Sequence, residues 1–86
     1  MENETLEIRV LFFALAQELA GESSIQLSLA APATAGDAEE ALKQRYQWLG
    51  EKLSSYRIAV DEEFCQGDTP LLNGSELAII PPVSGG

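Results

Sequence analysis

The sequence contains no histidine and only one cysteine, Cys65. Because histidine and cysteine supply most zinc ligands and many nucleophile–base pairs, the common metal sites, the Ser-His-Asp triad and the Cys-His dyad are excluded or incomplete. Cys65 cannot form an internal disulfide, and it follows Phe64 in a strand-like run, so we interpret it as a small hydrophobic residue rather than a nucleophile. No convincing pair of carboxylates replaces the missing groups. We therefore expect no bound cofactor or metal, and no catalysis by this chain alone.

Basic residues are also scarce. Five Lys and Arg stand against 14 Asp and Glu, which gives a formal net charge of −9. This balance argues against binding to nucleic acid or to an anionic membrane surface, and it suits a basic protein partner or simply solubility. Long apolar runs and a secretory signal are absent as well, so we expect a cytoplasmic protein with no membrane contact.

The 86 residues suit one small domain with a single core. Alternating apolar and polar residues predict strands at 6–13, 24–29, 57–61, 63–65 and 76–80. A short helix is predicted at 14–20, with Gly21 as its C-cap. The main helix begins at a capping box of Thr34 and Asp37. Its apolar stripe at 3.6-residue spacing comprises Ala38, Leu42, Tyr46, Leu49 and Leu53. The expected fold is an α+β roll with one sheet packed on one main helix.

Finer expectations concern individual side chains. Leu6, Ile8, Val10 and Phe12 form the core face of the first strand. Glu39 and Lys43 have the spacing of an ion pair on the main helix, and Gly50 is expected to weaken the end of that helix. We also expect Leu71 and Leu72 to anchor their loop in the core.

The last stretch, residues 79–86, has the sequence IIPPVSGG. Pro81 and Pro82 have no backbone N–H, so they end the last strand and hold the chain extended. Gly85 and Gly86 have no Cβ and suit a slot too narrow for other residues. We expect a domain over residues 1–80 and an extended, flexible Gly-Gly tail over 81–86. A frayed terminus is the better interpretation on composition alone, but the two prolines favour a tail presented to a partner.

An apolar patch is predicted beside this tail. Phe13 and Ile80 both lie at strand ends, on the face turned away from the main helix. If the first and last strands are neighbours, these residues lie together, with Leu11 and Phe64 nearby. Exposed aromatic and aliphatic clusters usually mark partner sites. We therefore prefer a partner-binding patch of Leu11, Phe13, Phe64 and Ile80 to scattered surface residues, which are also common.

Four segments resemble the small subunits of molybdopterin synthase, which are ubiquitin-like sulfur carriers. They are VLFFA at 10–14, ELAG at 18–21, NGSELA at 73–78 and IPPVSGG at 80–86. The resemblance covers nearly the whole chain, although the middle fits only by pattern, and PPVSGG is its specific part. Gln17, Asp61 and Ser75 depart from the residues frequent in that family, and none of them lies in the tail. The resemblance implies a β-grasp fold with one mixed sheet.

The resemblance also implies a function. In that family an E1-like ATP-dependent adenylyltransferase converts the terminal carboxylate, here on Gly86, to an adenylate, and sulfur then replaces AMP to give a thiocarboxylate (1-thioglycine). The tail enters the large subunit of molybdopterin synthase, where its sulfur passes to cyclic pyranopterin monophosphate to build molybdopterin. Gly85 and Ser84 would pass through the channel, with Pro81, Pro82 and Val83 bracing the tail. The assembly implied is a heterotetramer, with two small subunits at the ends of a large-subunit dimer.

Three alternatives remain open from the sequence. One is a sulfur carrier for another pathway, such as thiazole synthesis for thiamine, which binding to the corresponding synthase would reveal. Another is a ubiquitin-like protein modifier, which would give conjugates that disappear when Gly86 is deleted. The last is a plain interaction module, which would keep its activity without Gly85 and Gly86.

Overall fold

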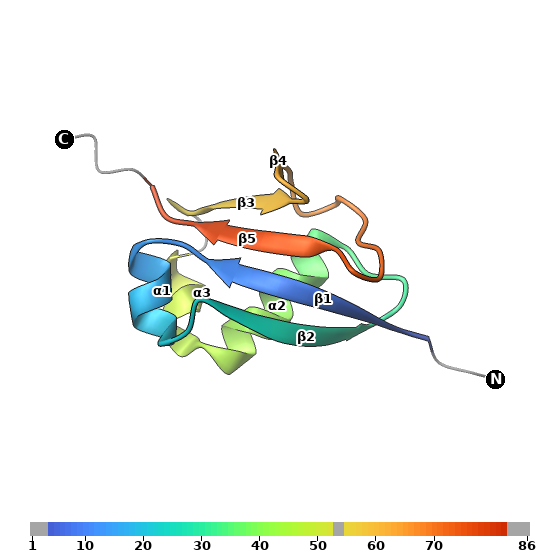
Figure 1. The fold of residues 1–86 in the computed structure, drawn as a ribbon, viewed down its shortest axis with the longest axis horizontal. Coiled ribbons are helices and arrows are strands. Elements are labelled where there is room, and N and C mark those ends of the chain that lie inside the picture. The colour runs from blue at the N-terminus through green and yellow to red at the C-terminus, as the bar shows by residue number, and fades with distance from the viewer. Residues whose placement is uncertain (1–3, 53–54, 83–86) are drawn as a thin grey trace.

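A computed structural model describes residues 4–52 and 55–82. Its strands form one five-stranded sheet in the order β2-β1-β5-β3-β4 (Figure 1). β1 and β5 run parallel and the other neighbours are antiparallel, so the sheet is mixed. This confirms the predicted α+β roll. The elements are β1 (Thr5–Phe12), α1 (Leu15–Ala20), β2 (Ser24–Ala30), α2 (Ala35–Arg45), α3 (Gln47–Lys52), β3 (Arg57–Val60), β4 (Glu63–Phe64) and β5 (Glu76–Ile80).

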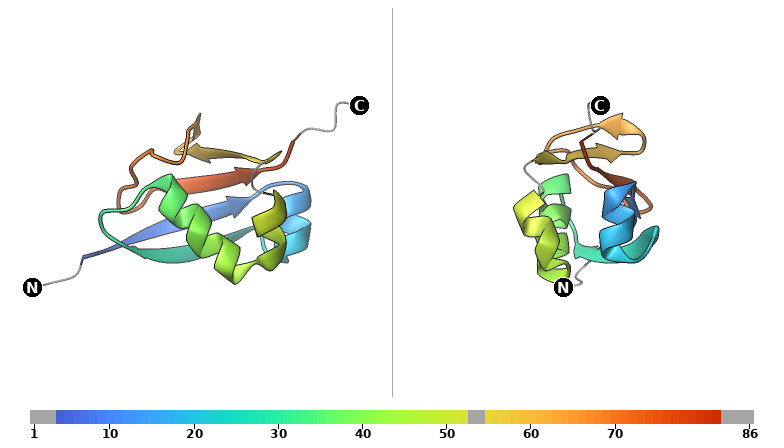
Figure 2. Two further views of the ribbon diagram at one scale, coloured as in Figure 1. Left: turned by 180° about the vertical axis from the view of Figure 1, so that it is seen from behind. Right: turned by 90° about the vertical axis from the view of Figure 1, so that its left-hand side faces the viewer.

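The core lies between the sheet and the helices. α2 crosses one face of the sheet, and α1 lies at the end of the sheet where the C-terminal segment leaves (Figures 1 and 2). Along β1, Ile8, Val10 and Phe12 are buried and Leu6 is half-buried, as predicted. Leu77 and Ile79 of β5, the strand between β1 and β3, are fully buried. The strand that leads into the C-terminal segment is therefore fixed by neighbours on both sides and by the core beneath it.

The N-terminus of α2 is held by two sets of hydrogen bonds. The predicted capping box is present: the Asp37 N–H donates to Thr34 Oγ1 at 3.3 Å, and the Thr34 N–H donates to Asp37 Oδ2 at 2.8 Å. The loop that follows β4 satisfies two further N–H groups of the first turn. Ala35 donates to the Thr69 carbonyl at 2.8 Å, and Gly36 donates to the Gly67 carbonyl at 2.7 Å. This loop therefore acts as a cap for the helix.

Gly36 is required by this close contact between helix and loop. A Cβ at Gly36 would lie 3.0 Å from the Gly67 carbonyl oxygen, whereas a Cβ at Gly50 in α3 would meet only Lys43 side-chain carbons, at 3.7 Å or more. We expect Gly36→Val to lower the free energy of unfolding by about 2 kcal/mol, because the loop must move away from the helix. Gly50→Val is the matched control and should have little effect. Urea denaturation of both variants measures the difference, and equal stabilities would contradict the contact.

The predicted single main helix is wrong, because the chain forms two helices here. α2 ends at Arg45, and Tyr46 is extended, with φ −127° and ψ 102°. The Tyr46 N–H still donates to the Leu42 carbonyl at 2.8 Å, and its ring meets the Phe12 ring edge-on, with centroids 5.4 Å apart. α3 then starts in a new direction and brings Leu49 fully into the core. Gly50 lies within α3, and Leu53 lies outside the described residues.

Two predicted side-chain positions also need correction. Lys43 Nζ pairs with Glu40 Oε2 at 2.8 Å, one turn away at i,i+3, rather than with Glu39. Glu39 is half-buried, and this burial raises the pKa of its carboxyl above the usual range. In the loop before β5, Leu71 is buried but Leu72 is 72% exposed. Successive residues of an extended chain point to opposite sides, so only one of the two leucines reaches the core.

Helix α1 turns its small residues inward. Ala16 is fully buried, whereas Leu15 and Leu19 are exposed. Gly21 takes the left-handed conformation with φ 78°, and its N–H donates to the Gln17 carbonyl at 3.0 Å, which confirms the predicted C-cap. The alanine face lets α1 lie close to the core and leaves its leucines on the surface.

Candidate docking face and base of the tail

One row of apolar side chains crosses the sheet face that α2 does not cover. The strand registers pair Leu11 with Ala78, Ala78 with Ala59, and Ala59 with Phe64. Residues opposite each other in a sheet project to the same side, so the row runs across β1, β5, β3 and β4. Ala59 and Ala78 are buried beneath their larger neighbours. The small residues form a floor, with Leu11 and Phe64 at its two ends.

The rows on either side of this floor differ in character. Toward the C-terminal end, Ile80 pairs with Arg57, and the Phe13 N–H donates to the Ile79 carbonyl at 3.2 Å, which brings Phe13 beside β5. In the opposite direction, Arg9 pairs with Glu76. The row toward the C-terminal end of the sheet is therefore apolar except for Arg57, and the row on the opposite side is charged.

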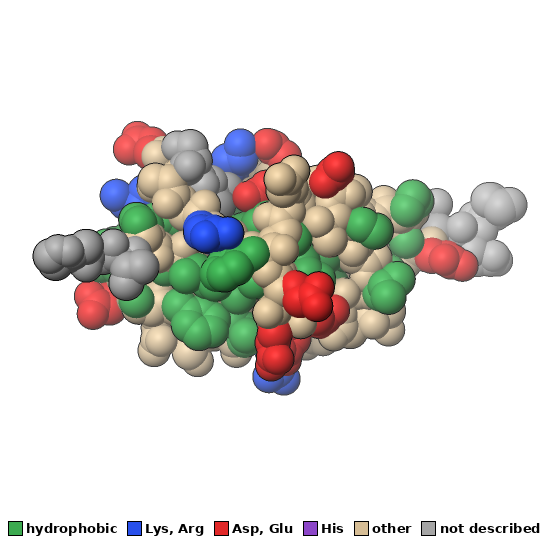
Figure 3. Space-filling view, turned by 90° about the horizontal axis from the view of Figure 1, so that it is seen from above, with side chains coloured by type: hydrophobic (Ala, Val, Ile, Leu, Met, Phe, Trp, Pro, Cys, Tyr) green, Lys and Arg blue, Asp and Glu red, His purple; other side chains and the backbone are tan. Residues whose placement is uncertain are grey.

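The apolar side chains of this face, with Glu62 and Glu76, border a hollow of about 220 Å³. We call it the docking hollow. All four residues of the predicted partner-binding patch line it, and the predicted neighbourhood of the first and last strands is confirmed. Phe13 is 47% exposed and Phe64 is 59% exposed. Figure 3 shows apolar surface gathered here, with charged side chains at its border. The lining residues are Leu11, Phe13, Ala59, Glu62, Phe64, Glu76, Ala78 and Ile80.

Arg57 adds a cation beside the predicted partner-binding patch, which was expected to be apolar. Its Cζ lies 3.9 Å from the centroid of the Phe64 ring, within the range of a cation–π contact. The contact depends on the hairpin of β3 and β4, which carries Phe64 back beside β3. The sequence does contain a signal for this position of Arg57. Arg57 precedes Ala59 by two residues, so in a strand both side chains project to the same face.

A second depression lies where the described chain ends. This tail-base groove has a volume of about 680 Å³ and shares Phe13 and Ile80 with the docking hollow. β5 ends at Ile80, as the two prolines predicted, and Pro81 is half-buried while Pro82 is exposed. Val83, Ser84, Gly85 and Gly86 lie outside the described residues, so their proposed roles stay predictions. The groove is lined by Phe13, Ala14, Leu15, Lys52, Ser55, Tyr56, Ile80, Pro81 and Pro82.

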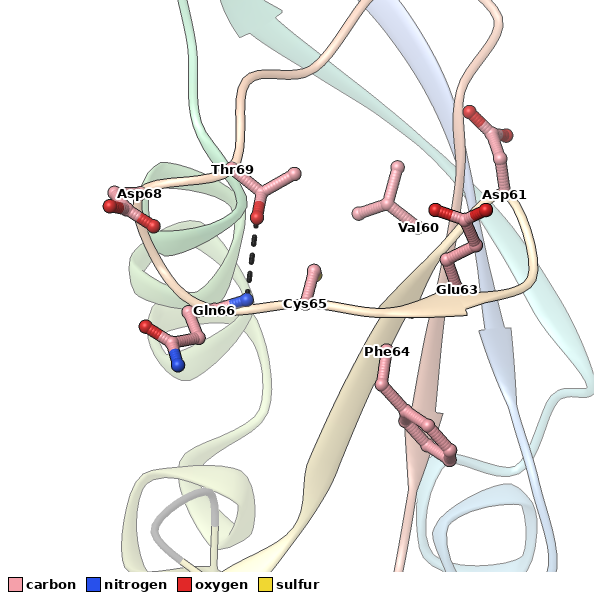
Figure 4. Close-up of a pocket in the computed structure, with 8 residues that line it drawn as sticks. All are labelled: Val60, Asp61, Glu63, Phe64, Cys65, Gln66, Asp68 and Thr69. Carbon is pink, nitrogen blue, oxygen red and sulfur yellow. Dashed lines mark hydrogen bonds between the residues drawn. The ribbon is translucent and has the colours of Figure 1, made fainter.

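Cys65 points away from the docking hollow. It lines a different hollow of about 650 Å³, together with Val60 and Thr69. Phe64 also borders this hollow, but its side chain extends from the opposite side of the chain (Figure 4). Burial raises the pKa of the Cys65 thiol, and hydrogen bonding by Thr69 only partly offsets this. A thiol with a raised pKa is protonated at neutral pH and is a poor nucleophile. This geometry agrees with our interpretation of Cys65 as a small hydrophobic residue.

Two kinds of feature are absent from the described ranges, 4–52 and 55–82. No three or more histidine, cysteine, aspartate or glutamate side chains gather there in a way that would hold a metal ion. No helix in these ranges has the length and apolar character needed to cross a membrane.

Comparisons with known proteins bear on the family and the fold of the chain. The model of the ThiS family matches residues 10–86. The chain is 34% identical to the molybdopterin synthase sulfur carrier subunit of Arabidopsis thaliana, covering 99% of this chain and 88% of that protein. Small archaeal modifier protein 1 from Methanosarcina acetivorans superimposes with a TM-score of 0.82 at 26% identity, covering 96% of this chain and 99% of that one.

A further solved structure contains a similar chain within a complex. It is the protein–protein complex of subunits 1 and 2 of molybdopterin-converting factor from Helicobacter pylori, matched with a TM-score of 0.66 at 26% identity. The match covers 94% of this chain and 100% of that chain. A ubiquitin-like protein from Trypanosoma brucei also matches, with a TM-score of 0.67 at 15% identity over 93% of this chain and 98% of that one, and this likeness confirms the ubiquitin-like β-grasp fold that the resemblance implied.

Proposed function

The chain belongs to the ThiS family, and we propose that it is the sulfur-carrying small subunit of molybdopterin synthase. On this proposal the carboxylate of Gly86 is adenylated, converted to a thiocarboxylate and delivered to the large subunit. There the sulfur is transferred to cyclic pyranopterin monophosphate, and two such transfers build the dithiolene of molybdopterin.

The observation that carries the proposal is the position of the docking hollow at the exit of the C-terminal segment. Ile80 ends β5 and lines the hollow, and the chain continues directly with Pro81. The six residues from Pro81 to Gly86 reach roughly 20 Å when extended, at about 3.3 Å per residue. A partner that covers the hollow therefore has the start of the tail beside it, and its reaction centre can lie this distance away.

The chemistry explains why such a carrier needs partners. A carboxylate is a poor acyl donor, so ATP first provides a leaving group: the Gly86 carboxylate attacks the α-phosphate, pyrophosphate leaves, and an acyl adenylate forms. Hydrosulfide then attacks the acyl carbon, AMP leaves with the bonding electron pair, and loss of the S–H proton gives the thiocarboxylate. The chain has five Lys and Arg against 14 Asp and Glu, a balance that disfavours binding of phosphate groups by this chain. The groups that bind ATP and the pterin belong to the partners on this proposal.

Two partners follow from this sequence of steps. An E1-like ATP-dependent adenylyltransferase charges the tail, and the large subunit of molybdopterin synthase accepts it in a heterotetramer. Because both must hold the same tail, we propose that Leu11, Phe13, Phe64 and Ile80 contact each partner in turn. On this proposal the chain carries the sulfur, and its two partners catalyse the loading and the transfer.

Intact mass spectrometry tests the carrier chemistry. The protein is incubated with ATP, a sulfur donor and the E1-like enzyme of the same host. We expect a mass increase equal to the exchange of one oxygen for one sulfur, located by fragmentation on Gly86. No change, with the enzyme shown to be active on a known carrier, would contradict the proposal.

One competing function has specific support. The likeness to small archaeal modifier protein 1 favours a protein modifier joined to lysine side chains. The same activated Gly86 would then react with an amine, forming an isopeptide bond as AMP leaves. Conjugates of higher mass in host lysate that disappear when Gly86 is deleted would favour the modifier. Sulfur transfer to the large subunit without conjugates would favour the carrier.

A further inference from the structure

We propose that charges at the two ends of the docking hollow fix the orientation of the bound partner. A carboxylate of the partner pairs with Arg57, and basic side chains of the partner face Glu62 and Glu76. The inference rests on the proposed function, because the occupant to which it commits is the large subunit of molybdopterin synthase.

Arg57 is placed to receive a carboxylate. It is exposed, it stands opposite Ile80, and its guanidinium is held over the Phe64 ring at 3.9 Å. Among the described residues the recorded ion pair is Lys43 with Glu40, so Arg57 has no acidic partner there. A partner that covers Phe64 removes water from the guanidinium, and an uncompensated buried charge is costly. A carboxylate on the partner restores that lost solvation with directed hydrogen bonds.

The opposite end of the hollow is lined by two acidic residues, and Arg9 stands beside one of them. Glu62, in the turn between β3 and β4, and Glu76, at the start of β5, both line it. Glu76 pairs in register with Arg9, whereas Arg57 pairs with Ile80 at the other end of β5. Arg57 and the two carboxylates that line the hollow therefore lie toward opposite ends of β5, the strand that leads into the tail. Figure 3 shows acidic side chains beside the apolar area, on the side away from the C-terminal end, with a basic side chain next to them.

The positions of these charges select one orientation of the bound large subunit. An apolar hollow alone binds an apolar surface of the partner almost equally well in several orientations of the partner, because the hydrophobic effect has no direction. A rotation by half a turn would place the partner's carboxylate against Glu62 and Glu76 and its cations against Arg57, and like charges disfavour that complex. Only the matched orientation keeps the start of the tail aligned with the partner's channel.

Charge reversal at Arg57 tests the inference, with Arg45 as a matched control. Arg45 is also exposed and also lies over an aromatic ring, 5.7 Å from the Tyr46 centroid, but it belongs to α2 on the other face. Calorimetric titration of the full-length chain into the large subunit should show about tenfold weaker binding for Arg57→Glu. Arg45→Glu, with the same change in net charge, should bind within about twofold of the unmodified chain. The difference should shrink at high salt.

Conservative and compensating changes separate charge from packing. Arg57→Lys keeps the charge and should bind more tightly than Arg57→Met, which keeps much of the apolar stem. On the large subunit, exposed carboxylates are changed to arginine one at a time. One of these changes should restore the affinity for Arg57→Glu and weaken binding of the unmodified chain.

The outcomes distinguish this inference from the proposed function. Equal affinities of Arg57→Glu and Arg45→Glu, or no restoring change on the partner, would overturn the orientation by charge. If Phe13→Glu also leaves binding intact, the docking hollow is not the contact surface at all. If Phe13→Glu weakens binding while Arg57→Glu does not, the hollow stands and only its polarity is wrong. Thermal unfolding confirms that each variant is folded.

Discussion

One alanine added after Gly86 is expected to abolish both sulfur loading and sulfur transfer. The extra residue moves the terminal carboxylate by about 3.5 Å and places a Cβ where the tail otherwise ends in glycine. Misplacement of a reacting group by even about 1 Å costs on the order of a hundredfold, so the extended chain should lose at least that much. Intact mass measures loading, and formation of molybdopterin by the reconstituted synthase measures transfer.

The control for this prediction is the same alanine added before Met1, which alters the length and composition equally. Neither addition changes the buried core, which extends from β1 to β5 and ends before Pro81. Both variants should therefore unfold at the temperature of the unmodified chain. A C-terminally extended protein that transfers sulfur at full rate, with its extra residue still present by mass, would contradict the role of Gly86.

The strands were predictable because burial on one face imposes a period of two. In β1 buried and exposed residues alternate along most of the strand, whereas in β5, an inner strand, Leu77, Ala78 and Ile79 are all buried. The turn at Asn73 and Gly74 marks the start of β5. Gly74 has φ 91°, a conformation that glycine adopts without strain. The prolines at 81 and 82 then define where β5 ends. Local chemistry therefore determined these elements with little help from tertiary contacts.

The end of α2 was not predictable in the same way. The apolar stripe continues through Tyr46 to Leu49 at helical spacing, and no glycine or proline marks the break. The break satisfies a tertiary contact, the edge-on packing of Tyr46 against Phe12 from β1. A contact between residues 34 positions apart leaves no periodic signal in either segment.

The candidate site was predictable in its apolar part and not in its charged part. The positions of Phe13 and Ile80 on the outer face of the sheet follow from the alternation of side chains along their strands. Placing Arg57 over Phe64 required the β3–β4 register, in which Ala59 pairs with Phe64. Asp61 and Glu62 form the tight turn with positive φ values of 51° and 74°. Non-glycine residues seldom adopt this conformation, so the register was difficult to infer from residue type.

Changing Phe13 to glutamate is expected to weaken binding to the large subunit by about a hundredfold. Phe13 borders both the docking hollow and the tail-base groove, so a partner that covers either of them contacts it. A carboxylate there would be taken out of water against apolar side chains, and Glu62 and Glu76 at the same hollow would add repulsion. The fold should survive, because the side chain is 47% exposed and its backbone N–H keeps its bond to the Ile79 carbonyl.

Leu19→Glu is the matched control for this change. Leu19 is 41% exposed, close to the exposure of Phe13, but it lies on α1 and lines neither depression. Calorimetry should show an affinity for Leu19→Glu within about threefold of the unmodified chain, since surface substitutions away from a contact have small effects. Circular dichroism and thermal unfolding establish that both variants are folded. Equal affinities for the two variants would show that partner binding does not use the docking hollow, whereas a selective loss for Phe13→Glu would place the contact at the exit of the tail.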